Sequence, residues 1–410
     1  MKQNSGPGRQ LQFPRAIWRT LWLLGVLTLS TGCSKPPASD PIGAFLDKHW
    51  QDPLPAQGMP PAGYSPLEAS LAPEACGTCH ADQYRDWKSA LHSRTMGPGI
   101  YWQFEKLGQG DSNRCLRCHA PLAEQKALLA LEMGWPDAPK TAPPGYVPAA
   151  LAHDGLACAA CHVRDHVRFG PARPANPGPA GAPHGGFVAA EAFRDSRFCA
   201  NCHQFPDDGP RLAGKLREDT YQQWRNSAYY PSQPCQSCHM PDGRHLWRGI
   251  HDPDMVRKAL ALEVQLQRLQ DGTYKAAVIA RNQGAGHALP TYLVPKIDLV
   301  LSLRRPGQAD LELARDVIGW RADVSMEHEE FDTRIPAGGS RRFEHGIRPP
   351  PGSWMLVLRA EVTPGEHYER MFRYSLDQVD LTPAARQTLA QALKETEATR
   401  FTALQVTARP

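Results

Sequence analysis

The chain has no cysteine to spare for a structural disulfide. Ten of its 11 cysteines fall in five copies of one short pattern, and the eleventh, Cys33, stands alone near the N-terminus. The segments between the copies also have few sustained apolar periods, so they cannot bury enough of their own side chains to fold unaided. A disulfide-stapled fold is therefore excluded, and another group must supply most of the core of that region.

The repeated pattern is Cys-x-x-Cys-His. Its copies are Cys76-Gly-Thr-Cys79-His80, Cys115-Leu-Arg-Cys118-His119, Cys158-Ala-Ala-Cys161-His162, Cys199-Ala-Asn-Cys202-His203 and Cys235-Gln-Ser-Cys238-His239. Two thiols at this spacing bond to the two vinyl groups of one porphyrin, and the histidine that follows ligates the iron. Structural zinc sites are the alternative, but an odd number of cysteine pairs suits four-cysteine sites badly. The pattern therefore predicts five covalently bound haem c groups.

Residues 1–32 contain no Asp or Glu. Four basic residues and then the apolar run from Leu21 to Leu29 give the layout of a secretory signal, too short to span a membrane. The segment from Leu29 to Cys33 is similar to a bacterial lipobox, which predicts a lipid on Cys33; the alternative is a simple signal cleaved nearby. Ser34 favours sorting to the outer membrane. We expect an exported protein, periplasmic or at the cell surface, that is lipid-anchored to the outer membrane.

The net charge of +4 comes entirely from those four signal residues, which leave 42 basic against 42 acidic residues in the remaining chain. Five haems would add about ten propionate groups and make the loaded protein acidic. Nothing in this charge supports nucleic-acid binding.

The sequence pattern changes at Leu260, where apolar and polar residues begin to alternate as in a half-buried strand. Asp271-Gly272 reads as a hairpin turn. Further strands are predicted at 273–281, 297–303, 311–313, 341–343, 356–362 and 370–374, and a helix at 383–399. Short strands separated by Gly and Pro turns are typical of a β-sandwich.

The predicted fold is a mainly α and irregular multihaem cytochrome c domain with a haem-packed core, followed by an all-β sandwich-like domain and a C-terminal helix. The expected boundaries are a signal peptide at 1–32, a proline-rich tether at 33–75, the haem domain at 76–259, the β-domain at 260–380, and the C-terminal helix and tail at 381–410.

A second axial ligand on each iron separates electron transfer from catalysis. Seven histidines outside the motifs lie in or beside the haem region, more than five irons require. We expect distal ligands at His92, His166, His184, His251 and His287, with His153 and His245 as competitors. The alternative for each is a solvated or propionate-binding histidine.

His287 is the one strong candidate from the β-domain. Glycines at 284 and 286 permit close approach of the backbone, and Pro290 restricts the turn that follows. We expect His287 to ligate a haem and so join the two domains; the alternative is that it merely caps a strand-connecting turn.

Three stretches carry a resemblance to bacterial multihaem c-type cytochromes of the cytochrome c554-related kind. They are the first motif with Tyr84 and Trp87, the fifth motif with Met240-Pro241, and Gly286-His287 with Pro290-Thr291. The resemblance covers roughly residues 70–295. It implies mostly bis-histidine haems stacked closely enough to pass electrons, with His92 and His287 as distal ligands. No motif ends in Lys, which departs from the pentahaem nitrite reductases.

We therefore expect an electron-transfer protein rather than an enzyme, one that relays electrons between a quinol-linked donor and a terminal acceptor. The alternative is an oxidoreductase acting on a small nitrogen or sulfur compound at one haem with an open distal site. A third reading makes the β-domain a docking module for partners.

Overall fold

The computed structural model describes residues 40–172 and 183–410. The predicted signal, Cys33 and the first part of the tether lie outside the described residues. Contacts divide the chain into a unit of residues 1–40 and a unit of residues 41–410. No helix in the described part of the chain is long and apolar enough to cross a membrane.

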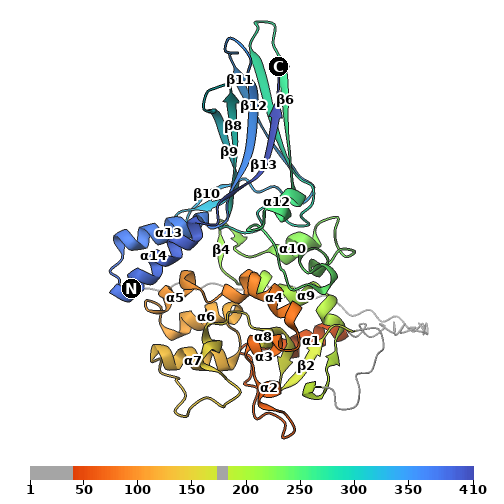
Figure 1. Ribbon diagram of the computed structural model, residues 1–410, viewed down its shortest axis with the longest axis vertical. Coiled ribbons are helices and arrows are strands. Elements are labelled where there is room, and N and C mark those ends of the chain that lie inside the picture. The colour runs from red at the N-terminus through yellow and green to blue at the C-terminus, as the bar shows by residue number, and fades with distance from the viewer. Residues whose placement is uncertain (1–39, 173–182) are drawn as a thin grey trace, which may run out of the picture. The chain divides into compact units, whose positions relative to one another are not determined.

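Short helices separated by irregular segments make up the first part of the larger unit (Figure 1). The α-helices are α1 Pro41–His49, α2 Pro66–Ala69, α3 Pro73–Gly77, α4 Ala81–Ser89, α5 Pro98–Phe104, α6 Gln109–His119, α7 Ala123–Met133, α8 Cys158–His162, α9 Arg197–His203, α10 Thr220–Arg225, α11 Cys235–His239 and α12 Pro253–Ala259. Five one-turn 3₁₀ helices lie between them, at Leu91–Arg94, Ala149–His153, Pro183–Gly185, Glu191–Arg194 and Pro241–Gly243. Five two- to four-residue strands complete the region: β1 Val163–Arg164, β2 Val167–Gly170, β3 Val188–Ala189, β4 Arg211–Leu212 and β5 Lys215–Leu216.

This region has a side-chain core of its own, which the sequence did not lead us to expect. Leu71, Leu116, Leu122, Leu129 and Leu151 are all fully buried in one cluster. Burying a leucine side chain contributes about 1.5–3 kcal/mol. The segment from the first motif to the third is therefore not held by bound groups alone.

Residues 41–75 do not form the predicted tether. α1, α2 and α3 belong to the larger unit, and Leu54, Ala69 and Leu71 are part of its leucine core. His49, on the last turn of α1, is buried and hydrogen-bonds through Nε2 to the carbonyl oxygen of Cys161 at 2.8 Å. The prolines in this segment start helices α1, α2 and α3 and shape turns, as residues with a fixed φ do.

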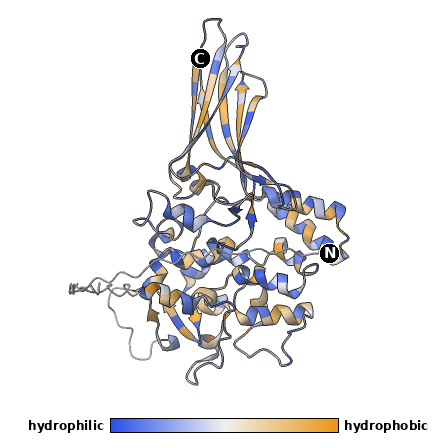
Figure 2. Ribbon diagram, turned by 180° about the vertical axis from the view of Figure 1, so that it is seen from behind, coloured by the Kyte–Doolittle hydropathy of each residue, from blue (hydrophilic) through white to orange (hydrophobic). Residues whose placement is uncertain are grey.

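The C-terminal part contains two antiparallel sheets that pack as a sandwich (Figure 1). Their strand orders are β10-β9-β8-β12-β13 and β11-β7-β6. The strands are β6 Leu260–Arg268, β7 Tyr274–Asn282, β8 Lys296–Arg304, β9 Leu311–Ala322, β10 Glu329–Asp332, β11 Ser340–Ile347, β12 Met355–Thr363 and β13 Phe401–Ala408. Hydrophobic and hydrophilic residues alternate along several of them (Figure 2), and the apolar faces of both sheets meet in one buried cluster.

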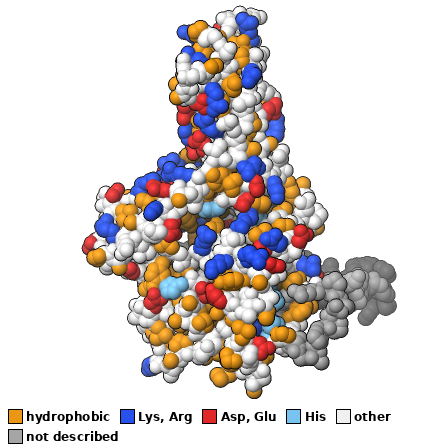
Figure 3. Space-filling model, in the orientation of Figure 1, with side chains coloured by type: hydrophobic (Ala, Val, Ile, Leu, Met, Phe, Trp, Pro, Cys, Tyr) orange, Lys and Arg blue, Asp and Glu red, His pale blue; other side chains and the backbone are white. Residues whose placement is uncertain are grey.

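Two predicted features of the C-terminal part were wrong. Residues 370–374, expected as a strand, lie in helix α13, Glu366–Gln378, whose buried side includes His367 and Phe372. The predicted tail contains β13, which pairs with β12 on the edge of the larger sheet. The helix predicted at 383–399 is present as α14, Pro383–Glu397, and Thr382 caps its first turn. On the face drawn in Figure 3, charged side chains of both signs are interspersed over the sheets.

Candidate haem-binding site

All ten motif cysteines and all five motif histidines line one cavity of about 4090 Å³. That volume is several times the 300–1,000 Å³ of an ordinary small-molecule site. The second, third, fourth and fifth motifs lie on or end helices α6, α8, α9 and α11, whereas the first spans the end of α3 and the start of α4. A helical turn brings the two thiols and the histidine of one motif to the same side of the backbone.

Hydrogen bonds select the tautomer of three motif histidines. Nδ1 of His119 lies 2.8 Å from the carbonyl oxygen of Thr95, that of His162 lies 2.7 Å from Phe169, and that of His239 lies 2.6 Å from Arg248. A carbonyl only accepts, so in each ring Nδ1 carries the proton and Nε2 is left with a lone pair. A metal-ligating histidine usually donates its other ring N–H in this way, which fixes the orientation of the ring.

Three of the five motif histidines, His162, His203 and His239, each face a second histidine ring. The ring centres are 6.4 Å apart for His92 and His203, 6.0 Å for His162 and His245, and 6.3 Å for His239 and His287. A metal–nitrogen bond of about 2 Å, as for zinc, and roughly 1 Å from that nitrogen to the ring centre place two imidazoles on opposite sides of one ion about 6 Å apart. The three pairs therefore have the spacing of bis-histidine ligation.

Distal candidates show the same tautomer preference. Nδ1 bonds to a backbone carbonyl in His184 (Gly186, 2.8 Å), His245 (Gly243, 3.0 Å) and His287 (Ala288, 2.9 Å), leaving Nε2 to bind a metal. Burial lowers the pKa of His92 to about 3 and that of His287 to about 4. Both rings are therefore neutral at pH 7, the form that ligates.

The prediction that His166 is a distal haem ligand was wrong. Its Nε2 is committed to the carbonyl oxygen of Gly58 at 3.1 Å, its ring packs on Tyr146, and it does not line the cavity. His153 is also outside the cavity, paired with Glu132 at 3.0 Å. His245, expected only as a competitor of His251, instead occupies the position opposite His162.

His184 and His251 both line the cavity. Among the described residues, neither ring lies opposite a motif histidine at about 6 Å. Their role as ligands stays a prediction.

A buried carboxylate fixes the segment that carries His245. Asp86, on α4, accepts two hydrogen bonds from the guanidinium of Arg244 at 2.7 and 2.6 Å, and a third from the backbone N–H of His245 at 3.2 Å. Trp247 packs between two distal candidates, with its ring 4.6 Å from that of His92 and 5.1 Å from that of His245. No local pattern in the sequence signals this contact, because Asp86 and His245 lie 159 residues apart.

The loop carrying His287 packs against the haem region. A side chain at Gly284 would place its Cβ 2.1 Å from the carbonyl oxygen of Lys258, and one at Gly286 would lie 3.1 Å from the ring of Tyr229. The two glycines are required there because the loop approaches backbone and an aromatic ring, as the sequence indicated for a close approach.

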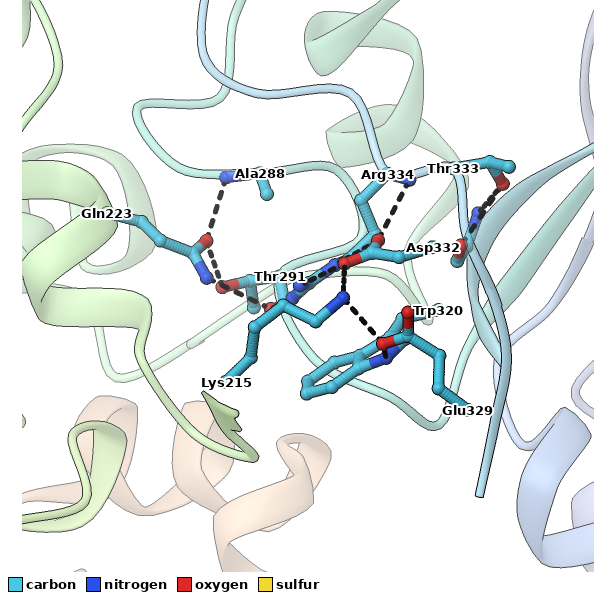
Figure 4. A network of polar contacts seen from close by, with 10 residues as sticks. Lys215, Gln223, Ala288, Thr291, Trp320, Glu329, Asp332, Thr333 and Arg334 are labelled. Atoms are coloured by element: carbon cyan, nitrogen blue, oxygen red, sulfur yellow. Dashed lines mark hydrogen bonds and ion pairs between the residues drawn. The ribbon is translucent and has the colours of Figure 1, made fainter. Parts of the chain in front are cut away.

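A polar network crosses from α10 to this loop (Figure 4). Gln223 accepts hydrogen bonds through Oε1 from the backbone N–H of Ala288 and the hydroxyl of Thr291, both at 3.0 Å. Arg334 donates to the carbonyl oxygen of Thr291 at 2.8 Å and pairs with Asp332, which also pairs with Lys215 at 2.6 Å. The segment that follows His287 is thus hydrogen-bonded both to α10 and to Arg334.

His119 differs from His162, His203 and His239, because no histidine ring faces it among the described residues. Its pKa is lowered by burial alone, without a neighbouring histidine. The sequence led us to expect more histidines than irons, but their number does not decide where they lie. The second motif is therefore a candidate for an iron with an open distal side.

Comparisons with known proteins support a multihaem c-type cytochrome. Residues 75–136 match the family described as cytochrome c554 and c-prime. The structure of a penta-haem cytochrome c552 from Thermochromatium tepidum superposes with a TM-score of 0.57 at 19% sequence identity, covering 84% of this chain and 100% of that one. The structure of a structural genomics target, SoR45, aligns over 26% of this chain and 77% of that chain at 11% identity. Its TM-score is 0.16, too low to indicate a shared fold. The search of curated proteins found no match.

Proposed function

We propose that this chain, whose family match and fold confirm the resemblance to multihaem c-type cytochromes of the cytochrome c554-related kind, carries electrons through five covalently bound, mostly bis-histidine haems. The three facing histidine pairs inside the cavity support this proposal most directly. Bound haem supplies reversible one-electron reduction at its iron.

The motif residues fit this group. Each cysteine pair supplies the two thiols for one porphyrin, and His80, His119, His162, His203 and His239 supply one nitrogen each. His92, His245 and His287 would hold the opposite side of the fourth, third and fifth groups. Neutral imidazoles on both sides would exclude water from the metal.

Contacts between motifs favour transfer among all five groups. Cys76 and Cys158 lie close enough for each thiol to shift the pKa of the other, as do Cys118 and Cys202. Cys199 and Cys235 form a third such pair. Cys161 also acts electrostatically on Cys199 and Cys202. The first motif is thus linked to the third, the third to the fourth, and the fourth to both the second and the fifth.

The proposed setting is the bacterial cell envelope. Cys33 would carry the lipid that anchors the protein to the outer membrane. Redox partner proteins, a quinol-linked donor and a terminal acceptor, would exchange electrons with the bound groups.

Mass spectrometry and low-temperature EPR of the oxidised protein test the proposal. We expect five covalent haems and a spectrum dominated by low-spin ferric iron. Fewer than five attached groups, or bound zinc in their place, would contradict the proposed cofactor content. A spectrum that is mainly high-spin would contradict bis-histidine ligation.

A second candidate function is supported by His119. An iron held only from the proximal side is open to a small molecule, so the chain would be an oxidoreductase for a small nitrogen or sulfur compound at the second motif. We expect one high-spin ferric signal for this reason. Carbon monoxide binding by the reduced protein at one haem, followed by turnover of nitrite or hydroxylamine, would favour this function over electron transfer alone.

A further inference from the structure

His92 lacks the hydrogen bond that orients the other two histidines facing a motif ring. Nδ1 of His245 lies 3.0 Å from a backbone carbonyl oxygen, and that of His287 lies 2.9 Å from another. Nδ1 of His92 is buried and has no hydrogen-bond partner among the described residues. A hydrogen bond at this nitrogen normally fixes the orientation of a ligating ring. A different contact therefore has to fix the plane of the His92 ring.

The backbone of His92 is held in place, so the plane of its ring depends on rotation of the side chain. Its carbonyl oxygen accepts from the N–H of Leu156 at 2.9 Å and from the hydroxyl of Thr95 at 3.2 Å. Among the described residues, two rings pack on its imidazole: that of His203 at 6.4 Å and that of Trp247 at 4.6 Å. The closer ring, Trp247, meets the imidazole at 73° in an edge-on contact. Aromatic rings favour this geometry, so the contact restricts rotation of the imidazole.

Trp247 is itself held on both sides. Its φ is +42°, in the left-handed region that bulky residues rarely adopt, and such a conformation persists only where surrounding contacts enforce it. Its N–H donates to the carbonyl oxygen of His239 at 2.9 Å. The next residue, Arg248, accepts from Nδ1 of His239 at 2.6 Å and donates to the carbonyl and hydroxyl oxygens of Ser89, both at 2.8 Å. The indole is thus tied to the fifth motif and to the end of α4, the helix that precedes His92.

We propose that Trp247 is a positioning residue that sets the plane of the His92 ring opposite the fourth motif. Its indole takes the place of the missing hydrogen bond at Nδ1. The imidazole planes of His92 and His203 are 54° apart, whereas the pair at the fifth motif, where a carbonyl bond orients His287, is only 14° from parallel. The inference rests on the proposed function, because it requires haem at the fourth motif.

The angle between two axial imidazoles has a spectroscopic consequence. Each imidazole donates π electrons to the iron d orbital that lies perpendicular to its own plane. Parallel planes act on the same orbital and separate its energy from that of the other, whereas crossed planes act on both. The low-spin ferric EPR signal therefore changes shape when one ring rotates, even if both ligands stay bound. A residue that only fills space would not move this signal.

The test uses the loaded protein. Trp247→Leu removes the flat ring and keeps apolar bulk, whereas Trp247→Phe keeps a smaller ring. Trp102→Leu is the matched control, because Trp102 is buried, packs on Phe372 and does not line the cavity. Haem content is measured first, and His92→Ala identifies the low-spin signal of the fourth haem. Fewer than five haems in the native protein, or no signal lost in His92→Ala, would be a failure of the proposed function and not of Trp247.

We expect Trp247→Leu to change the shape of the signal identified with His92→Ala. Loss of the aromatic contact should also raise the apparent affinity of that haem for cyanide roughly two- to tenfold. Trp247→Phe should change the same signal less, and it carries the test if Trp247→Leu does not load five haems. The ring of His245 also touches Trp247, at 5.1 Å, but keeps its carbonyl bond, so the signal of the third haem should stay as in the native protein.

Three results would overturn the role of Trp247. The first is a native signal and native cyanide affinity in both Trp247 variants. The second is the same change in Trp102→Leu, which would indicate a general loss of packing. The third is a change confined to the signal that His245→Ala removes, which would mean that Trp247 orients His245 and not His92.

Discussion

Replacing Gln223 by Leu should weaken the attachment of His287 without touching the histidine itself. Oε1 of Gln223 accepts from the N–H of Ala288 and the hydroxyl of Thr291, both at 3.0 Å. An N–H left without its acceptor costs about 1–3 kcal/mol, and the lost Thr291 bond about 0.5–1.5 kcal/mol. Because Thr291 keeps Thr220 as a partner at 2.8 Å, we expect a total of about 2–3 kcal/mol.

The affinity of an added ligand that competes with His287 for the iron measures this loss of loop stability directly. A loss of about 2–3 kcal/mol in the loop corresponds to a gain of roughly 30- to 150-fold in the apparent affinity of the fifth haem for cyanide. The assay is a cyanide titration of the oxidised protein, followed by the low-spin EPR signals. Gln222→Leu is the matched control on the same helix, since the side chain of Gln222 bonds only to the exposed Asn226 among described residues.

Two results would refute the reasoning in different ways. If Gln223→Leu and Gln222→Leu bind cyanide equally, the network of Figure 4 does not hold the loop. If His287→Ala also leaves every low-spin signal in place, His287 is not a ligand, whatever the network does. His287→Met should instead keep the iron low-spin and raise one reduction potential, because a Met/His ligand pair raises the potential.

Three further predictions follow from particular residues. Cys33→Ala should move the protein from the membrane to the soluble fraction, and a variant that stays in the membrane would argue against the lipid. His245→Ala should create a new high-spin ferric signal, whereas His166→Ala should not; equal spectra for both would remove His245 as a ligand. Burial raises the pKa of Asp154 from 3.8 to about 6, so the stability linked to its protonated form is present below about pH 4 and lost as the pH rises through about 6. Asp154→Asn should therefore raise the free energy of unfolding at pH 7 and match the native protein near pH 4, as measured by denaturant titration at both pH values.

Local signals in the sequence were sufficient for the covalent part of the site. The ten thiols and five histidines of the motifs are specified by their spacing within five residues, and the structure gathers all of them around one cavity. Alternation from Leu260 onward likewise predicted β6, β7, β8 and β12, because a half-buried strand has a period of two in any fold. Helix α14 was predicted from its apolar face, and the structure adds the cap at Thr382.

Tertiary contacts decided which residues lie opposite the three motif histidines that have a facing histidine. His245 faces His162 because Asp86, far away in the sequence, holds Arg244 and the backbone beside it. His166 was a plausible ligand by position, but its Nε2 is already bonded to Gly58. A histidine carries no local pattern that distinguishes ligation from an ordinary hydrogen bond.

The C-terminal domain shows the same limit. Residues 370–374 have apolar and polar positions compatible with a strand, yet they belong to helix α13, whose buried face packs Phe372 against Trp102. That packing brings His367 to the cavity, a residue that no motif in the sequence marked. Spacing along the chain predicts where haem attaches, because thioether chemistry involves only neighbouring residues. The partners across the cavity come from segments that are far from the motifs along the chain, and only the folded chain brings them together.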